Sequence, residues 1–155
     1  MELVLLIGLQ GSGKSTFYRR TFASTHVLVS KDNFRNNRRP QRRQMHLIEE
    51  ALKQGHSVVV DNTNPTLEDR AAITGLAKAH GATICGFYFD APLADCLERN
   101  RRRSSKARVP DAALHITSKR MRPPLVDEGF DRLHRVRISS DNAFSIREWP
   151  EGNAQ

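Results

Sequence analysis

Residues 8–15 read Gly-Leu-Gln-Gly-Ser-Gly-Lys-Ser and match the pattern G-x-x-x-x-G-K-[ST] at every fixed position. They follow the apolar run Leu-Val-Leu-Leu-Ile at residues 3–7, which is typical of a buried strand. In such a loop the glycines let several backbone N–H groups converge on phosphate oxygens, and the helix that follows adds its positive dipole end. The pattern therefore predicts a nucleoside triphosphate site, the alternative being an ordinary glycine-rich turn from strand to helix.

The loop also contains the side chains that we expect to hold the phosphate donor. We expect Lys14 to reach the β- and γ-phosphates and Ser15 to bind Mg²⁺. The expected ligands are thus ATP, or another NTP, and Mg²⁺. The other nucleotide-binding residues predicted in this region are Gly8, Gly11, Ser12, Gly13 and Thr16.

Strand-like and helix-like stretches alternate along the rest of the chain, which is typical of βαβ units stacked into a parallel sheet. The apolar runs are nearly continuous, as expected for strands that are covered on both faces. We expect an α/β fold of the P-loop NTPase type, with about five parallel strands and helices on both faces. The predicted strands are 2–7, 26–30, 56–61, 83–90 and 134–139, and the predicted helices are 14–23, 41–54, 66–80, 92–102 and 110–121.

With 155 residues, of which 38% are hydrophobic, the chain has the size of one domain, and we expect a single domain over residues 1–155. No apolar run approaches the roughly 20 residues that cross a bilayer. The two cysteines, Cys85 and Cys96, lack the spacing of a metal site or a disulfide framework. These features predict a cytoplasmic protein that does not bind a membrane, and they leave its oligomeric state open.

The net charge of +8 is unevenly distributed. Five arginines lie within residues 35–43, and five arginines and a lysine lie within residues 99–108. Such clusters indicate a polyanionic partner, although a solvated basic surface is the simpler alternative. Residues 101–108 of the second cluster are polar, basic and flanked by predicted helices, and we expect a mobile lid at about residues 101–109.

Ligands of open parallel sheets bind at the carboxyl ends of the strands, so the residues that follow each strand are candidates for chemistry. Asp32 follows the second predicted strand, and we expect it to be the general base that accepts the proton of an attacking hydroxyl. The alternative is that Asp32 caps a helix. Arg35 lies three residues later, on the same face if the turn is helical, and could hold the acceptor together with Asp32.

Asp61 ends the third predicted strand, after three valines, and we expect it to contact Mg²⁺ through a water. The next three residues, Asn62, Thr63 and Asn64, are candidates for acceptor binding, or simply a capped turn before the following helix. In the helix before the lid, Arg99 and Arg103 are spaced i, i+4 and are expected to face the phosphates. One lid arginine could stabilise the transition state, but spacing does not select which.

Taken together, these motifs resemble the kinase domain of polynucleotide 5′-hydroxyl kinases. The resemblance runs from about residue 3 to about residue 138. Besides the phosphate loop it includes Asp-x-x-Arg at 32–35, Asp-Asn-Thr-Asn at 61–64 and Arg-Asn-x-x-Arg at 99–103, with Val-Pro at 109–110. The loop alone occurs in a vast superfamily, whereas the combination is far more specific.

The resemblance implies that the protein transfers the γ-phosphate of ATP, or of another NTP, to the 5′-OH end of DNA or RNA. By position, Lys14 and Ser15 would hold the donor phosphates and the metal, and Asp32 would be the base. Arg35 would hold the phosphate on the 3′ side of the acceptor nucleotide, and Arg103 would be the lid arginine.

The sequence departs from the family pattern in two ways. Phage-type members have aspartate where Asn62 stands, whereas animal repair enzymes share Asp-Asn-Thr-Asn. Family members are often fused to a phosphatase or ligase domain, yet no Asp-x-Asp-Gly-Thr phosphatase signature is present, and we expect a kinase module alone.

Two other functions are consistent with the phosphate loop. The first is a small-molecule kinase of the same superfamily, acting on a sugar, nucleoside or antibiotic hydroxyl, which would have less need of the arginines in residues 35–43. The second is a nucleotide-dependent nucleic-acid-binding module that transfers nothing. A guanine-reading Asn-Lys-x-Asp motif is absent.

Overall fold

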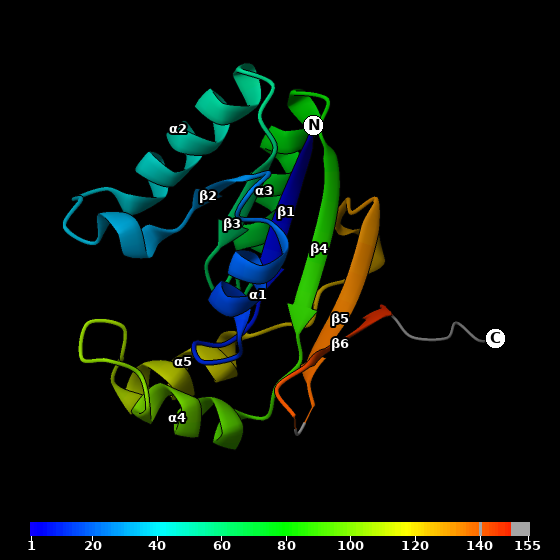
Figure 1. Ribbon diagram of the computed structural model, residues 1–155. Helices are drawn as coiled ribbons and strands as arrows, with labels where there is room; N and C mark the ends of the chain where they lie inside the picture. Colours follow the sequence, from blue (N-terminus) through cyan, green and yellow to red (C-terminus); the bar gives the residue numbers. More distant parts are fainter. Residues whose placement is uncertain (140, 150–155) are drawn as a thin grey trace.

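The computed structural model describes residues 1–139 and 141–149. Within these residues one sheet forms the centre of the molecule, with five parallel strands and a sixth, β6, that runs antiparallel to β5 (Figure 1). In spatial order the strands are β2 (Val27–Val29), β3 (Val58–Asp61), β1 (Glu2–Ile7), β4 (Thr83–Phe89), β5 (Arg132–Ile138) and β6 (Phe144–Glu148).

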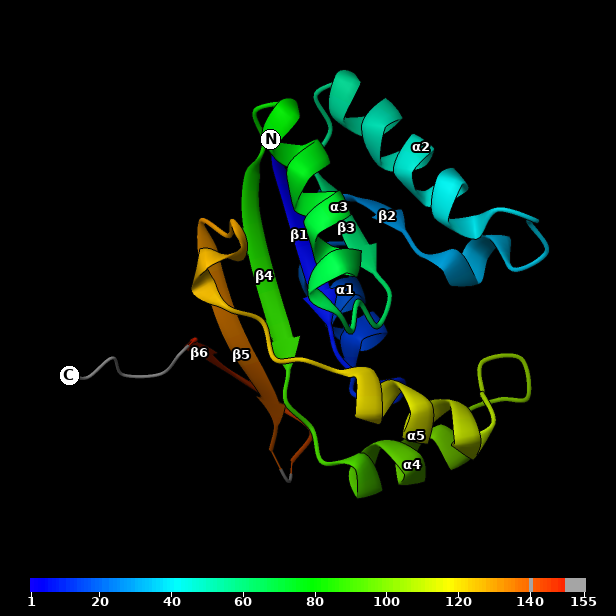
Figure 2. The same ribbon diagram turned by 180° about the vertical axis from the view of Figure 1, so that it is seen from behind.

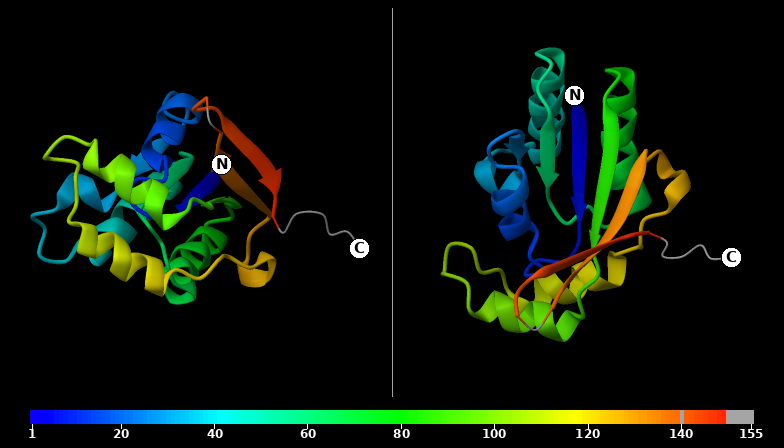
Figure 3. Two further views of the ribbon diagram at one scale, coloured as in Figure 1. Left: turned by 90° about the horizontal axis from the view of Figure 1, so that it is seen from below. Right: turned by 45° about the vertical axis from the view of Figure 1, so that its right-hand side comes forward.

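Helices lie on both faces of the sheet and at its carboxyl end. The described helices are α1 (Lys14–Thr21), α2 (Pro40–Lys53), α3 (Leu67–Ala79), α4 (Leu93–Arg101) and α5 (Asp111–Arg120), with the 3₁₀ turns η1 (Lys31–Phe34) and η2 (Val126–Glu128). One face is covered by α1 and the other by α2 and α3 (Figure 2). The pair α4 and α5 lies below the carboxyl ends of the strands (Figure 3). The predicted α/β fold of the P-loop type is confirmed.

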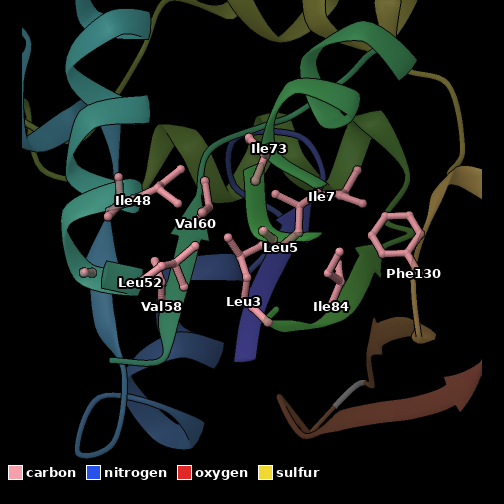
Figure 4. Close-up of a cluster of buried hydrophobic side chains, with 14 of the residues drawn as sticks. Leu3, Leu5, Ile7, Ile48, Leu52, Val58, Val60, Ile73, Ile84 and Phe130 are labelled. Carbon is pink, nitrogen blue, oxygen red and sulfur yellow. The ribbon is translucent and has the colours of Figure 1, made fainter. Parts of the chain in front are cut away.

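The central strand β1 is buried on both faces, which explains its unbroken apolar sequence. Leu3, Leu5 and Ile7 point to the side of α2 and α3, where they join Ile48, Leu52 and Ile73 of those helices in one cluster (Figure 4). The alternate residues Val4 and Leu6 point to the opposite side and pack with Phe17 of α1. Burying each such side chain contributes roughly 1.5–3 kcal/mol. The strand before the phosphate loop is therefore held firmly in place.

The sequence did not predict β6. Four of its five residues are exposed, so the strand carries almost no hydrophobic signal of its own. Its one partly buried residue, Phe144, packs on Phe17 of α1, with ring centroids 5.2 Å apart. The predicted second strand is also shorter than expected, because only Val27–Val29 pair with β3.

No described helix combines the length and the apolar character that a membrane span requires. The predicted single domain over residues 1–155 includes residues 140 and 150–155, which lie outside the described residues. The domain organisation therefore stays a prediction.

Candidate active site

The phosphate loop connects β1 to α1 in a conformation that its glycines require. Gly11 and Gly13 have φ values of 80° and 99°, in the left-handed region that side chains disfavour. A Cβ on Gly11 would lie 2.6 Å from the carbonyl oxygen of Cys96 in α4. One on Gly13 would lie 2.8 Å from the Cδ1 atom of Ile138 in β5. The loop is thus closely packed between α4 and the end of β5.

Lys14 is buried, and its Nζ atom donates hydrogen bonds to the carbonyl oxygens of Gly8 and Leu9, at 2.9 and 2.8 Å. Burial lowers the pKa of the Lys14 ammonium group, and the nearby Asp61 carboxylate acts in the opposite direction. The Asp61 carboxylate therefore only partly offsets the cost of burying the positive charge of Lys14. An anion at the loop would provide the missing charge.

Ser12 lies inside the loop. Its Oγ atom is buried and has no hydrogen-bond partner in the part of the chain that the structure describes. An unpartnered buried hydroxyl is costly unless a ligand or water satisfies it. Both Gly8 and Ser12 lie behind the loop surface, so they support the site from within.

Ser15 and Asp61 lie together at the start of α1 and the end of β3. The Ser15 hydroxyl donates to the Asp61 Oδ2 atom over 2.8 Å. A hydroxyl and a carboxylate are oxygen ligands of the kind that Mg²⁺ binds together with waters and phosphate oxygens. No group of three or more His, Cys, Asp or Glu side chains suited to a metal occurs among the described residues. The Ser15 hydroxyl and the Asp61 carboxylate fit a metal that the phosphates of a nucleotide help to bind.

A cleft of about 650 Å³ opens over the phosphate loop. Its walls come from the loop, η1, the end of β3 and the helices α4 and α5. The predicted site residues that line it are Gly11, Gly13, Lys14, Ser15, Thr16, Asp32, Asp61, Asn62, Thr63, Asn64, Arg99 and Arg103. The fold thus brings together predicted site residues from four separate segments, 11–16, 32, 61–64 and 99–103.

Asp32 lies in η1 on one wall of this cleft, with its side chain 68% exposed. The turn is capped by Ser30, whose hydroxyl accepts a hydrogen bond from the Asp32 backbone N–H. Since Ser30 is the cap, the Asp32 carboxylate is not used in that role. Its ion-pair partner among the described residues is Arg35, at 3.6 Å.

Arg35 does not line the cleft. Its guanidinium group donates to the carbonyl oxygen of Lys106, over 2.9 Å, and so joins η1 to the loop between α4 and α5. The same loop is anchored by Asn100, whose amide donates to the Val109 carbonyl and accepts from the Val109 N–H. Arg99 turns back to the phosphate loop, with Nη1 3.5 Å from the Gly11 carbonyl oxygen. The predicted lid is thus tied at its base and touched by η1.

The three residues after Asp61 make structural hydrogen bonds. Asn62 accepts from the Lys31 N–H and donates to Gln44 of α2. The Thr63 carbonyl accepts from the Gly8 N–H, and the buried Asn64 side chain donates to the Leu6 carbonyl. These contacts fix the floor of the cleft, while acceptor binding by the same side chains stays a prediction.

Sequence reasoning missed two kinds of residue. The first is Arg70 of α3, which is fully buried, pairs with Glu128 at 2.8 Å and donates to the Asn64 carbonyl. Nothing in the local pattern of a helix distinguishes such an arginine from an exposed one. The second kind is the cation in the cleft wall, represented by Arg19, Lys31 and Arg120. Only the fold brings these three elements to one cleft.

The fold is an α/β P-loop kinase fold, with a cleft over its phosphate loop. Residues 3–124 match the model of a family described as an AAA domain, and the chain belongs to this family. A protein of Acanthamoeba polyphaga mimivirus, provisionally named a bifunctional polynucleotide phosphatase/kinase, is 31% identical over 150 residues. These cover 92% of this chain and 35% of that protein.

A bifunctional polynucleotide phosphatase/kinase of Schizosaccharomyces pombe is 28% identical over 139 residues, covering 87% of this chain and 33% of that protein. The chain therefore spans about a third of the length of these two relatives. Among solved structures, a gluconokinase from Sinorhizobium meliloti 1021 has the same fold, with a TM-score of 0.63 and 18% identity. That match covers 89% of this chain and 83% of the gluconokinase.

Proposed function

We propose that the protein transfers the γ-phosphate of ATP, or of another NTP, to the 5′-OH end of DNA or RNA. The observation that carries the proposal is that Asp32 lines the same cleft as Lys14 and Ser15. The relatives named polynucleotide phosphatase/kinases, which match most of the chain, support a polynucleotide as the acceptor.

Asp32 acts as the general base in this proposal. Its exposed carboxylate accepts the proton of the 5′-OH group while the 5′ oxygen forms a bond to the γ-phosphorus. The bond from that phosphorus to the β–γ bridging oxygen breaks, and the nucleoside diphosphate leaves. Arg35, which forms an ion pair with Asp32 at 3.6 Å, would hold the phosphate on the 3′ side of the acceptor nucleotide.

The donor is held by the phosphate loop. Lys14 exchanges its two carbonyl partners for the β- and γ-phosphates, which relieves its uncompensated burial. Ser15 and Asp61 would hold Mg²⁺, which neutralises charge on the β- and γ-phosphate oxygens when bound. Ser12, Gly13 and Thr16 complete the cradle with backbone N–H groups and hydroxyls.

Arg99 and Arg103 of the lid region face the cleft and stabilise the charge that builds on the transferred group. Arg103 is the stronger candidate for this role. Arg99 already has a partner in the loop, the Gly11 carbonyl, whereas Arg103 is near enough to Lys14 to lower the pKa of that ammonium group.

A small-molecule kinase is the second candidate, favoured by the shared fold of the gluconokinase. Transfer of label from [γ-³²P]ATP separates the two. We expect label on a 5′-OH oligonucleotide of DNA or RNA and none on the same oligonucleotide carrying a 5′-phosphate. Label on a sugar or nucleoside, with none on any oligonucleotide, would favour the second candidate. Oligonucleotide binding without any transfer would indicate a non-catalytic module.

A further inference from the structure

A second cavity, of about 360 Å³, lies beside the start of α2. We call it the basic cavity; it is lined by Asn37, Arg38, Arg39, Arg42, Arg43 and His46. It shares no lining residue with the cleft over the phosphate loop. Nothing in the proposed transfer of phosphate uses it.

The arginines of the basic cavity lack carboxylate partners. Within residues 1–139 and 141–149, none of these four guanidinium groups makes an ion pair. Arg42 and Arg43 lie in the first turn of α2 and Arg38 and Arg39 lie just before it, so four positive charges gather at the helix N-terminus, where the helix dipole disfavours them. This arrangement does not help the helix. It is suited to anions that bind between the arginines, since guanidinium groups bind phosphates through paired hydrogen bonds.

The residues of the basic cavity follow shortly in the sequence after the wall of the cleft that holds Asp32. Asn37 follows Arg35 by two residues, and Arg35 contacts both Asp32 and the lid carbonyl of Lys106. The loop before α2 and the loop between α4 and α5 lie on the same side of the molecule (Figure 1). A strand whose 5′ end lies at Asp32 would pass Arg35 and its contact with the Lys106 carbonyl to reach the start of α2.

We propose that the basic cavity binds phosphodiester groups of the acceptor strand, beyond the nucleotide whose 5′-OH reacts. The inference rests on the proposed function and deepens it. Arg38 and Arg39 precede α2, whereas Arg42 and Arg43 lie in its first turn, so the two pairs can hold different phosphates. The protein then prefers acceptors of several nucleotides over a nucleoside 3′-monophosphate, which has no phosphate to place there.

The test compares the double variant Arg42→Ala/Arg43→Ala with a charge-matched control, Lys78→Ala/Arg132→Ala. Lys78 lies at the end of α3 and Arg132 at the start of β5, at the end of the sheet opposite the cleft. The basic-cavity variant should raise KM for a 5′-OH oligonucleotide roughly 10–100-fold, with kcat retained. Its kcat/KM for a nucleoside 3′-monophosphate should stay unchanged. The control variant should keep the wild-type KM and kcat for both acceptors.

Salt dependence gives a second readout that does not require turnover. The logarithm of the binding constant for a fluorescent single-stranded oligonucleotide falls linearly with the logarithm of the salt concentration. For each phosphate contact removed, this slope should become less steep by about 0.7. The inference is overturned if the basic-cavity variant keeps the wild-type slope, or if it impairs both acceptors equally. If the wild type phosphorylates no oligonucleotide, the proposed function fails instead, and the slope still tells whether the basic cavity binds the strand.

Discussion

At the scale of single residues, Asp32 is the most informative position. Asp32→Asn keeps the size of the side chain and removes its ability to take a proton. We expect phosphate transfer to slow by roughly 10²–10⁴-fold. ATP affinity should stay nearly intact, because Lys14 and Ser15 hydrogen-bond to other groups. Single-turnover kinetics and an ATP binding titration measure the two effects separately, and a collapse of ATP binding would assign Asp32 to the donor site.

The burial of Lys14 affects the stability of the nucleotide-free fold. Its pKa is lowered by burial, so the folded protein binds this proton less readily than the unfolded chain does. The charged ammonium group therefore destabilises the nucleotide-free fold at neutral pH. Lys14→Met should abolish phosphate transfer and raise the melting temperature of the nucleotide-free protein. Each 1 kcal/mol gained in unfolding free energy should raise this temperature by about 2–4 °C.

The pH dependence of this effect has a definite sign. As the pH rises through the lowered pKa of Lys14 towards the ordinary value of 10.5, the wild type loses the buried charge and gains stability. The advantage of Lys14→Met should therefore shrink between neutral pH and about pH 10.5. Denaturant unfolding of both proteins at several pH values measures the difference. An advantage that grows with pH would contradict the role given to burial.

At the scale of elements, Gly11 joins the phosphate loop to α4. Gly11→Ala places a Cβ 2.6 Å from the Cys96 carbonyl oxygen at a φ of 80°, so loop and helix must separate. We expect a loss of about 1–3 kcal/mol in unfolding free energy, together with weaker ATP binding. The matched control is Gly75→Ala in α3, where a Cβ meets nothing within 4 Å. That change should stabilise the protein by about 0.4–1 kcal/mol.

Asn100 determines how firmly the lid loop is held. The side chain is fully buried and hydrogen-bonds both the N–H and the carbonyl of Val109. Asn100→Ala leaves these two backbone groups unsatisfied, which costs about 1–3 kcal/mol. Hydrogen exchange should speed up in residues 101–109 and kcat should fall, while Asp32 and Lys14 remain in place. Unchanged exchange in these residues would mean that the loop is held by other contacts.

The elements that the sequence predicted well are those with a strong hydrophobic pattern. Buried runs such as β1 and β4 are recognisable because both faces of the sheet are covered. By contrast, β6 is mostly exposed and forms through pairing with β5, a contact that the local sequence does not encode. The turn η1 shows the same limit, because the local sequence left open whether Asp32 caps a helix, and only the folded turn shows that Ser30 is the cap.

At the scale of the whole molecule, the proposed single domain has a thermodynamic consequence. The sheet shares its strands between the two clusters that pack on its faces, so neither cluster can form without the other. We expect one cooperative thermal transition, in which the calorimetric and van't Hoff enthalpies agree. ATP at a concentration 100 times its Kd should raise the unfolding free energy by about 2.7 kcal/mol. Two resolved transitions would contradict a single domain.

The assembly of the site depended on the fold in a way that spacing could not supply. The positions of Lys14, Ser15 and Asp61 in the cleft could be predicted, because Lys14 and Ser15 belong to the phosphate-loop pattern and Asp61 ends an apolar strand. The sequence did not predict that Arg35 contacts the Lys106 carbonyl or that Arg70 is buried with Glu128. These contacts join residues far apart in the sequence, since Arg70 and Glu128 are separated by 58 residues and Arg35 and Lys106 by 71.

The most direct measurement is a crystal structure with a non-hydrolysable ATP analogue, Mg²⁺ and a 5′-OH oligonucleotide. We predict that a carboxylate oxygen of Asp32 lies about 2.6–3.2 Å from the 5′-OH oxygen, which faces the γ-phosphorus. Lys14 should have left the Gly8 and Leu9 carbonyls for the phosphates. A 5′-OH bound away from Asp32, or an Asp32 carboxylate too far from the γ-phosphate for any hydroxyl to lie between them, would contradict the proposed transfer.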